Sequence, residues 1–244
     1  MKLTTDALVI RENNTVGESD RFVTLLTRDK GIIRASVRGA RQLKNRNGSA
    51  TQLLCYSRLS LYKGRDKYIV DDAEPLQVFF EVRNQLEKLA LAQYFCELAG
   101  VLAPSEEPAE EELRLLLNAL HYLAEGTRPL ALIKAVVELR LLCRAGYMPA
   151  LAGCVTCATT ERLLFSPLRG VLYCIEHAEG NDGIPLSAGA FAAMRHVAMS
   201  PFEKCFAFSL PETDLAVFAQ AVERFLLAQL NRGFNTLEFY HSLG

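Results

Sequence analysis

The chain has 244 residues, a formal net charge of −1 and 50% hydrophobic residues, a composition typical of a folded globular protein that excludes a largely disordered one. Its apolar runs are shorter than the roughly 18 residues that a membrane-spanning helix requires, and the charges of Lys2, Asp6, Arg11 and Glu12 argue against a signal peptide. The seven cysteines are an odd number, so we expect reduced thiols in a cytoplasm rather than a secreted disulfide framework.

The N-terminal third is predicted to be a small β-barrel. Short runs rich in β-branched and aromatic residues alternate with turn or polar segments, which indicates strands at residues 8–10, 21–26, 32–37, 59–62 and 68–70. Five short strands without a helical period between them suit a closed barrel. The OB-fold is the first candidate, and a five-stranded SH3-like barrel stays open as an alternative. We assign residues 1–80 to an OB-fold nucleic-acid-binding domain.

This third of the chain is also its basic part. Residues 1–80 hold 14 Lys and Arg against 9 Asp and Glu, whereas the remaining residues hold 13 against 19. Within residues 28–67 the counts are 11 and 2. A ligand responds to the local field more than to the net charge, so we expect the barrel to meet an anionic partner.

The connection between the third and fourth predicted strands is unusually long and polar. Residues 38–49, called the basic connection below, contain two glycines, no acidic residue and four cations, which are Arg38, Arg41, Lys44 and Arg46. Such a segment can follow a phosphate backbone without a fixed side-chain geometry. We expect it to be mobile until it meets one.

Beyond residue 80 the hydrophobic period becomes helical. Apolar residues recur at steps of three and four in residues 82–101 and 113–123, which predicts two helices. Residues 104–108 are polar and rich in proline, so we expect a solvated linker between these helices. Residues 81–244 are therefore predicted to form an all-α domain, which makes the whole chain an α+β protein of two domains.

Three further helices are expected toward the C-terminus. Thr127 and Pro129 are typical of a helix start, and Gly146 is typical of the end of the same helix. Ser187 is predicted to cap a fourth helix. An apolar stripe then predicts a final long helix that ends at Gly233.

A possible metal site interrupts the helical domain within residues 150–180. Cys154 and Cys157 form one pair, and Cys174 and His177 form a second pair after sixteen intervening residues. Two short ligand pairs at this separation are typical of a zinc ribbon, because each two-residue gap lets one tight turn aim both side chains at a tetrahedral centre. The alternative is that Cys157 and Cys174 are buried apolar residues and His177 is a solvated surface residue. We favour one structural zinc, since four protein ligands leave no open position for catalysis.

The other cysteines and histidines do not form ligand pairs. Cys96 and Cys143 lie on apolar helix faces and are expected to be core thiols. The remaining five have no partner at ligand spacing, and these are Cys55, Cys205, His121, His196 and His241. No glycine is followed by lysine, and the chain contains no G-x-S-x-G, H-E-x-x-H or G-x-G-x-x-G motif. We therefore expect no catalytic site.

Two blocks of the sequence resemble those of a known family. The first block comprises residues 7–11, 17–21, 23–31 and 35–41. The second comprises residues 138–142 and 145–149, Cys154 and Cys157, Phe165 and Ser166, and Leu186 and Ser187. In this order they are similar to the N-terminal barrel and the helical domain of the RecO recombination mediators. The chain departs from the commoner four-cysteine pattern of that family by placing His177 at the last ligand position.

The resemblance implies a function in DNA repair. A protein of this family would bind single- and double-stranded DNA and help complementary strands to anneal. With a RecR partner it would help to load RecA onto strands covered by single-stranded DNA-binding protein, whose C-terminal tail the helical domain would hold. The resemblance implies a bacterial cytoplasmic protein associated with the nucleoid.

Residues of the barrel itself supply candidates for a DNA-binding surface. Its basic side chains are Arg34, Arg38, Arg41, Lys44, Arg46, Lys63, Arg65 and Lys67. Tyr56, Tyr62 and Tyr68 could stack on bases, although we expect each to belong to the barrel core. The alternative function is that of a non-catalytic adaptor whose basic barrel binds an acidic protein partner.

Overall fold

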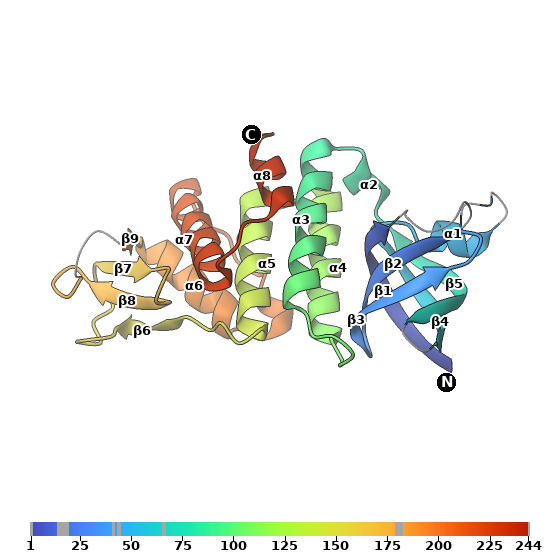
Figure 1. Cartoon of the computed structure of the whole chain (residues 1–244). Coiled ribbons are helices and arrows are strands. Elements are labelled where there is room, and N and C mark those ends of the chain that lie inside the picture. Colours follow the sequence, from blue (N-terminus) through green and yellow to red (C-terminus); the bar gives the residue numbers. More distant parts are fainter. Residues whose placement is uncertain are drawn as a thin grey trace. The chain divides into compact units, whose positions relative to one another are not determined.

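A computed structural model of the chain forms two compact units (Figure 1). The first unit contains Met1–Glu125 and Asn235–Gly244, and the second contains Gly126–Phe234. The structure describes residues 2–13, 20–40, 42, 45–64, 67–178 and 183–243. Among the helices of these residues, none combines the length and the hydropathy needed to cross a membrane.

A barrel of five strands forms the N-terminal part of the first unit. The strands are β1 (Lys2–Asn13), β2 (Arg21–Thr27), β3 (Gly31–Val37), β4 (Cys55–Lys63) and β5 (Tyr68–Val78). They close in the order β1-β2-β3-β5-β4, with β4 paired to β1. Neighbouring strands are antiparallel except β3 and β5, which are parallel. The predicted strands are confirmed, and together with the helices they confirm the α+β class.

The alternation of side chains places the barrel core. Val23 and Leu25 of β2 and Ile33 and Ala35 of β3 are buried, whereas the residues between them in each strand point outward and are partly or fully exposed. β1 and β5 are longer than predicted because backbone pairing continues through polar residues, among them the exposed Lys2 of β1 and Glu74 of β5. Sequence patterns based on apolar residues do not detect such strand ends.

Residues 46–49 of the basic connection are helical. Helix α1 (Arg46–Ala50) begins after Asn45, whose side chain accepts a hydrogen bond from the Asn47 amide. A side chain at Gly48 would overlap the carbonyl oxygen of Ala40, so only glycine allows this close approach. Ala50 is fully buried, and its carbonyl accepts a 2.7 Å hydrogen bond from the Ser57 hydroxyl. The expectation of a mobile connection is therefore wrong for residues 46–49.

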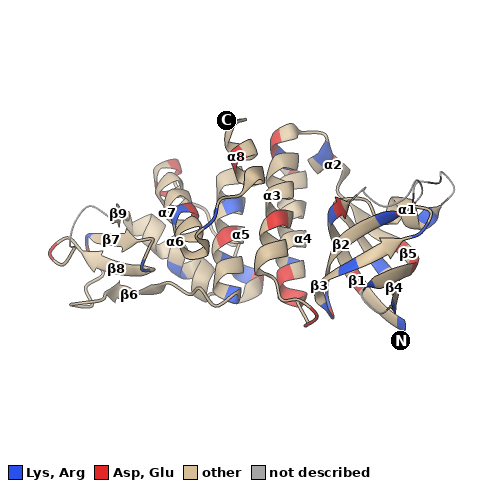
Figure 2. Cartoon of the chain, in the orientation of Figure 1, with Lys and Arg blue, Asp and Glu red and all other residues tan. Residues whose placement is uncertain are grey.

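Four further helices of the first unit lie within the described residues. They are α2 (Phe80–Arg83), α3 (Leu86–Leu102), α4 (Glu110–Glu125) and the C-terminal α8 (Asn235–His241). The first turn of α4 is acidic, and its carboxylates stabilise the positive N-terminal end of the helix dipole (Figure 2). Helix α8 packs on α3, where Thr236 donates a 2.6 Å hydrogen bond to Glu97. Helix α8 was not predicted, because its seven residues are too few for a clear hydrophobic period.

The predicted linker at residues 104–108 is not simply solvated. The Ile32 amide donates a 2.8 Å hydrogen bond to the carbonyl of Pro104, and the Ser105 hydroxyl donates a 3.0 Å hydrogen bond to the carbonyl of Ile32. Gly31 has a φ of +54°, and a side chain there would overlap the carbonyl oxygen of Pro104. The linker thus binds to the edge of β3 at its first residues, which fixes the position of the residue that follows.

We expect Gly31→Ala to destabilise the first unit, because the added side chain would have to adopt a positive φ and would overlap the Pro104 carbonyl oxygen. Positive φ costs a residue with a side chain about 1 to 2 kcal/mol, and the overlap with Pro104 adds about 1 to 3 kcal/mol. Gly146→Ala is the matched control, because Gly146 has a φ of +95° but no atom within 4 Å of the added carbon. Urea unfolding followed by circular dichroism measures both variants. Equal losses in free energy of unfolding would show that the Pro104 contact adds nothing.

The second unit combines helices with a small sheet. Its helices are α5 (Leu130–Arg144), α6 (Ala188–Met199), the 3₁₀-helix η1 (Phe202–Lys204) and α7 (Glu212–Leu230). Its strands are β6 (Ala150–Cys154), β7 (Leu163–Ser166), β8 (Val171–Cys174) and β9 (Ile184–Pro185), in the order β6-β8-β7-β9. The Ser187 cap is confirmed, since its hydroxyl accepts a 3.1 Å hydrogen bond from the Ala190 amide. Helix α7 ends at the left-handed Asn231, two residues before the predicted Gly233.

The compact units and the predicted domains divide the chain at different places. The predicted boundary at residue 80 follows the last barrel strand and precedes the first helix. The compact units instead group α2, α3, α4 and α8 with the barrel. Residues 81–244 therefore contain helices from both units.

Candidate metal centre and nucleic-acid interface

Two similar turns of the second unit present the predicted metal ligands. Cys154 is the last residue of β6, and Cys174 is the last residue of β8. After each strand the chain turns back, and the amide four residues later donates to the cysteine carbonyl, from Ala158 at 2.8 Å and from Ala178 at 3.0 Å. The parallel pairing of β6 with β8 brings these two turns together.

The four donor atoms lie close enough to share one ion. The three Sγ atoms and an imidazole nitrogen of Cys154, Cys157, Cys174 and His177 are all within 4.8 Å of one another. The Sγ atoms of Cys157 and Cys174 are 3.8 Å apart. His177 Nδ1 is 3.1 Å from Cys174 Sγ and 3.9 Å from Cys154 Sγ. A tetrahedral zinc with bonds of about 2.0 to 2.3 Å separates its ligands by about 3.5 to 3.8 Å, and the three separations above lie within about half an ångström of this range.

The surroundings of Cys154 favour the thiolate that a metal requires. Burial of the thiol opposes ionisation, but hydrogen bonds from the backbone amides of Cys157, Cys174 and Thr156 outweigh it and lower the pKa of Cys154 to about 6. Cys157 is exposed, so burial in an apolar core does not explain the position of its thiol. The alternative of an ordinary core cluster is therefore disfavoured, and the donor set could hold a metal ion.

The remaining thiols have the opposite character. Burial raises the pKa of Cys96 to about 12 and the pKa of both Cys143 and Cys205 to about 11. Burial also raises the pKa of Cys55. Thiols with such values are poor nucleophiles at neutral pH. Two of the isolated histidines bind locally, since His196 Nε2 is 2.8 Å from the Lys204 carbonyl and His121 Nε2 is 3.2 Å from the Glu125 carboxylate.

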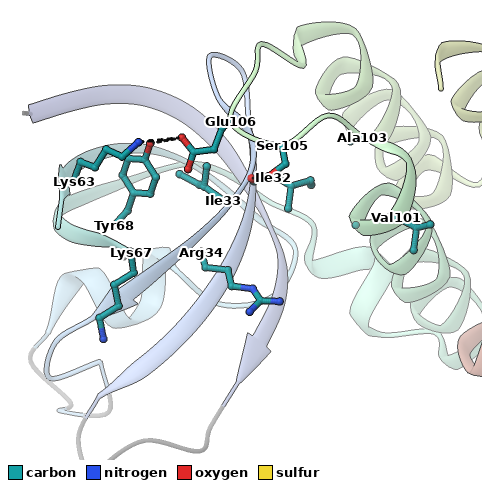
Figure 3. A pocket seen from close by; sticks show the side chains of 11 residues that line it. Ile32, Ile33, Arg34, Lys63, Lys67, Tyr68, Val101, Ala103, Ser105 and Glu106 are labelled. Carbon is teal, nitrogen blue, oxygen red and sulfur yellow. Dashed lines mark hydrogen bonds and ion pairs between the residues drawn. The ribbon is translucent and has the colours of Figure 1, made fainter. Parts of the chain in front are cut away.

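Three of the predicted DNA-binding cations line one groove of the first unit (Figure 3). This groove, called the basic groove below, has a volume of about 710 Å³. Arg34 reaches it from β3, Lys63 from the end of β4, and Lys67 from the turn before β5. Its apolar wall includes Ile32 and Val101. The groove thus combines several cations with apolar surface.

The other predicted cations lie elsewhere. Arg38 is exposed in the turn after β3, and Arg46 is exposed at the start of α1. Neither lines the basic groove. Arg41, Lys44 and Arg65 lie outside the described residues. No carboxylate within the described part of the chain is within salt-bridge distance of Arg34, Arg38 or Arg46.

The aromatic residues of the barrel fall into different environments. Tyr68 is buried in the barrel core, as expected, while its hydroxyl reaches the groove. Tyr56 is half-buried, and Tyr62 is 45% exposed beneath the ammonium of Lys2, so the core assignment is wrong for Tyr62. Phe22 on the outer face of β2 was missed, although Lys67 Nζ lies 4.3 Å from the centre of its ring. In β2, Phe22 alternates with the buried residues Arg21, Val23 and Leu25. The period-two pattern of a strand could therefore have placed Phe22 on the outer face of the barrel.

One acidic residue of the basic groove was also missed. Glu106 lies 3.4 Å from Lys63 Nζ and accepts a 2.8 Å hydrogen bond from the Tyr68 hydroxyl (Figure 3). Its carboxylate raises the pKa of Lys63. Glu106 belongs to the segment expected to be a solvated linker, and no local pattern in the sequence places it beside these cations.

Comparisons with known proteins match both parts of the chain. Residues 1–79 match the family described as "Recombination protein O N terminal", and residues 83–238 match "Recombination protein O C terminal". The DNA repair protein RecO of Acetivibrio thermocellus is 33% identical over 99% of this chain and 97% of its own length. The DNA repair protein RecO of Symbiobacterium thermophilum is 33% identical over 98% and 96%. That of Dehalococcoides mccartyi is 31% identical over 91% and 90%.

Proposed function

The chain belongs to the RecO family of DNA repair proteins, and from this premise we propose that it is a non-catalytic recombination mediator that binds single- and double-stranded DNA. Its barrel would hold the nucleic acid, and strand annealing would follow from binding two complementary strands. With RecR it would help to load RecA onto DNA covered by single-stranded DNA-binding protein. The C-terminal tail of single-stranded DNA-binding protein would bind within residues 81–244. The protein would act in the bacterial cytoplasm, on the nucleoid.

The order of the barrel strands supports an OB-fold. A five-stranded barrel with β1 paired to both β2 and β4, and with β3 parallel to β5, has the connectivity that we propose to be an OB-fold. Nucleic acids bind such barrels on the face of the second and third strands and on the loops after the first and fourth strands. This gives a specific place to look for the DNA contacts.

The observation that carries the proposal is that the three cations of the basic groove lie at that place, and that Phe22, which does not itself line the groove, lies beside one of them, Lys67. Phe22 and Arg34 lie on β2 and β3, and Lys63 and Lys67 flank the turn between β4 and β5. An aromatic ring beside several cations is the combination that binds single strands, because the ring stacks on a base while the cations contact phosphates. We propose that Phe22 contributes to the DNA surface together with the eight basic residues predicted from sequence.

Titration with a labelled oligonucleotide tests this function. An oligothymidylate of roughly 20 nucleotides exceeds the roughly 4 to 16 nucleotides that one OB-fold covers. We expect binding that strengthens with oligonucleotide length and weakens at least about tenfold between about 50 mM and about 200 mM salt. Fluorescence anisotropy measures both effects. Tight binding to an acidic peptide with no binding to DNA at either salt would support the adaptor function instead.

The cysteine and histidine cluster supports a structural role for zinc. We propose that Cys154, Cys157, Cys174 and His177 hold one Zn²⁺ per chain, which would cross-link β6 to β8 at the ends of both strands. A closed set of four protein ligands leaves no position for a reacting water. The high pKa values of the other thiols agree with a protein that has no catalytic cysteine.

A further inference from the structure

The basic groove already contains an anion of the chain itself. Of the described residues that line it, Glu106 is the acidic one, and its carboxylate contacts two groove residues, Lys63 and Tyr68. An ammonium group and a phenolic hydroxyl at 3.4 Å and 2.8 Å are the kind of donors that a phosphate oxygen would use. The carboxylate therefore occupies a position suited to a phosphate.

The backbone holds Glu106 at this position. Pro104 and Ser105 are hydrogen-bonded to β3 at Ile32, so the residue after them begins at a fixed point on the barrel. Glu106 then adopts a φ of +61°, in the left-handed region that disfavours a side chain. The next residue, Glu107, is exposed and does not line the groove. The placement of one carboxylate in the groove thus results from the local fold and not from a general acidic surface.

We propose that Glu106 is an internal competitor of the nucleic-acid phosphate, so that DNA enters the basic groove by displacing its carboxylate from Lys63 and Tyr68. This inference rests on the proposed function of DNA binding. The side chains of Lys63 and Glu106 are 57% and 49% exposed, so water and salt weaken their ion pair and a polyanion can replace it. Arg34 and Lys67, which line the same groove, would then bind neighbouring phosphates together with the released Lys63.

If the Glu106 carboxylate competes with DNA, removing its charge should strengthen DNA binding, whereas removing a groove cation should weaken it. We expect Glu106→Gln to bind the oligothymidylate about two- to fivefold more tightly than the parent at about 50 mM salt, the effect of one exposed charge pair. The difference should shrink toward about 200 mM salt, because salt screens the carboxylate. Glutamine keeps an acceptor for the Tyr68 hydroxyl. Glu107→Gln is the matched control, since it makes the same charge change one residue away and should leave the affinity unchanged.

A double-mutant cycle with Lys63→Met separates displacement from a general change in charge. In the parent, Lys63 gives up the Glu106 carboxylate when it binds a DNA phosphate, so its net contribution to DNA binding is small. We therefore expect Lys63→Met to weaken DNA binding by less than about twofold. In the Glu106→Gln background Lys63 has no internal partner, and its removal should cost about two- to fivefold. Circular dichroism and thermal unfolding confirm that each variant is folded.

The outcomes distinguish this inference from the function on which it rests. Equal affinities for the parent, Glu106→Gln and Glu107→Gln would overturn the competition while leaving DNA binding intact. Equal losses on Lys63→Met in both backgrounds would overturn displacement from Lys63. A parent protein that binds no oligonucleotide at either salt concentration would overturn the proposed function and this inference together.

Discussion

Replacing Cys174 by serine should remove the zinc and unfold the sheet of the second unit. The protein purified without chelators is expected to contain about one zinc per chain, and the variant close to none, because a serine hydroxyl does not replace a thiolate ligand. The cluster joins the end of β6 to the end of β8, and only four short strands form this sheet. Structural zinc contributes about 10 to 16 kcal/mol to the folding of small zinc domains, which equals or exceeds the total stability of many domains.

Cys205→Ser is the matched control for the zinc prediction. Cys205 is a fully buried thiol of the same unit, but it does not belong to the cluster. Its replacement can cost stability by placing a hydroxyl in an apolar site, yet zinc content should stay at about one per chain. Elemental analysis and thermal unfolding measure the two effects separately. A parent protein without zinc, or a Cys174→Ser variant that keeps it, would contradict the proposed metal centre.

The metal cluster could be predicted from the sequence because its geometry is local. Each ligand pair needs only one turn, and the residues between the pairs form a hairpin of β7 and β8 that returns the chain to its starting point. Spacing alone therefore fixes which side chains meet. Similarly, Gly146 and the cap at Ser187 act on their own helices, and both were predicted correctly.

The basic groove depends on contacts that no local pattern reports. Glu106 is 43 residues from Lys63 and 38 residues from Tyr68, and it reaches them only because backbone hydrogen bonds attach residues 104 and 105 to β3. Phe22 meets Lys67 through the closure of the barrel. Helix α1 was not predicted, because the basic connection was judged by its polar, glycine-containing composition. The helix instead depends on the Asn45 cap at its start and on the close packing of Gly48.

Neutralising the basic connection should produce the largest loss of DNA binding. We expect the alanine variant of Arg38, Arg41, Lys44 and Arg46 to bind the oligothymidylate at least about tenfold more weakly than the parent at about 50 mM salt. Each cation that contacts a phosphate contributes about 0.7 to 0.9 to the slope of log affinity against log salt, so the slope should fall by roughly 3. Sequence preference should stay slight in both proteins, because phosphate contacts carry no base information.

The groove cations provide a second variant that locates the DNA more closely. Arg34→Ala with Lys67→Ala removes two cations that line the basic groove, and the slope should fall by roughly 1.5. A charge-matched control for the larger variant replaces four exposed cations of the second unit with alanine, which are Arg195, Lys204, Arg224 and Arg232. This control changes the net charge equally and should leave the slope nearly unchanged.

The pattern across these variants decides which surface the phosphate backbone follows. Arg38 and Arg46 lie outside the basic groove, so a DNA strand that contacts both sets must extend from β3 toward α1. Weaker DNA binding and a smaller salt slope in both variants would support such a path. Weaker binding only in the variant of Arg34 and Lys67 would restrict the strand to the basic groove. If the basic-connection variant binds with the parent's affinity and salt slope, its cations are only a solvated rim. The contacts would then have to come from the groove cations Arg34, Lys63 and Lys67, from Arg58 or Arg65, or from the second unit. Arg58 would first have to leave Asp6, which holds it at 2.8 Å.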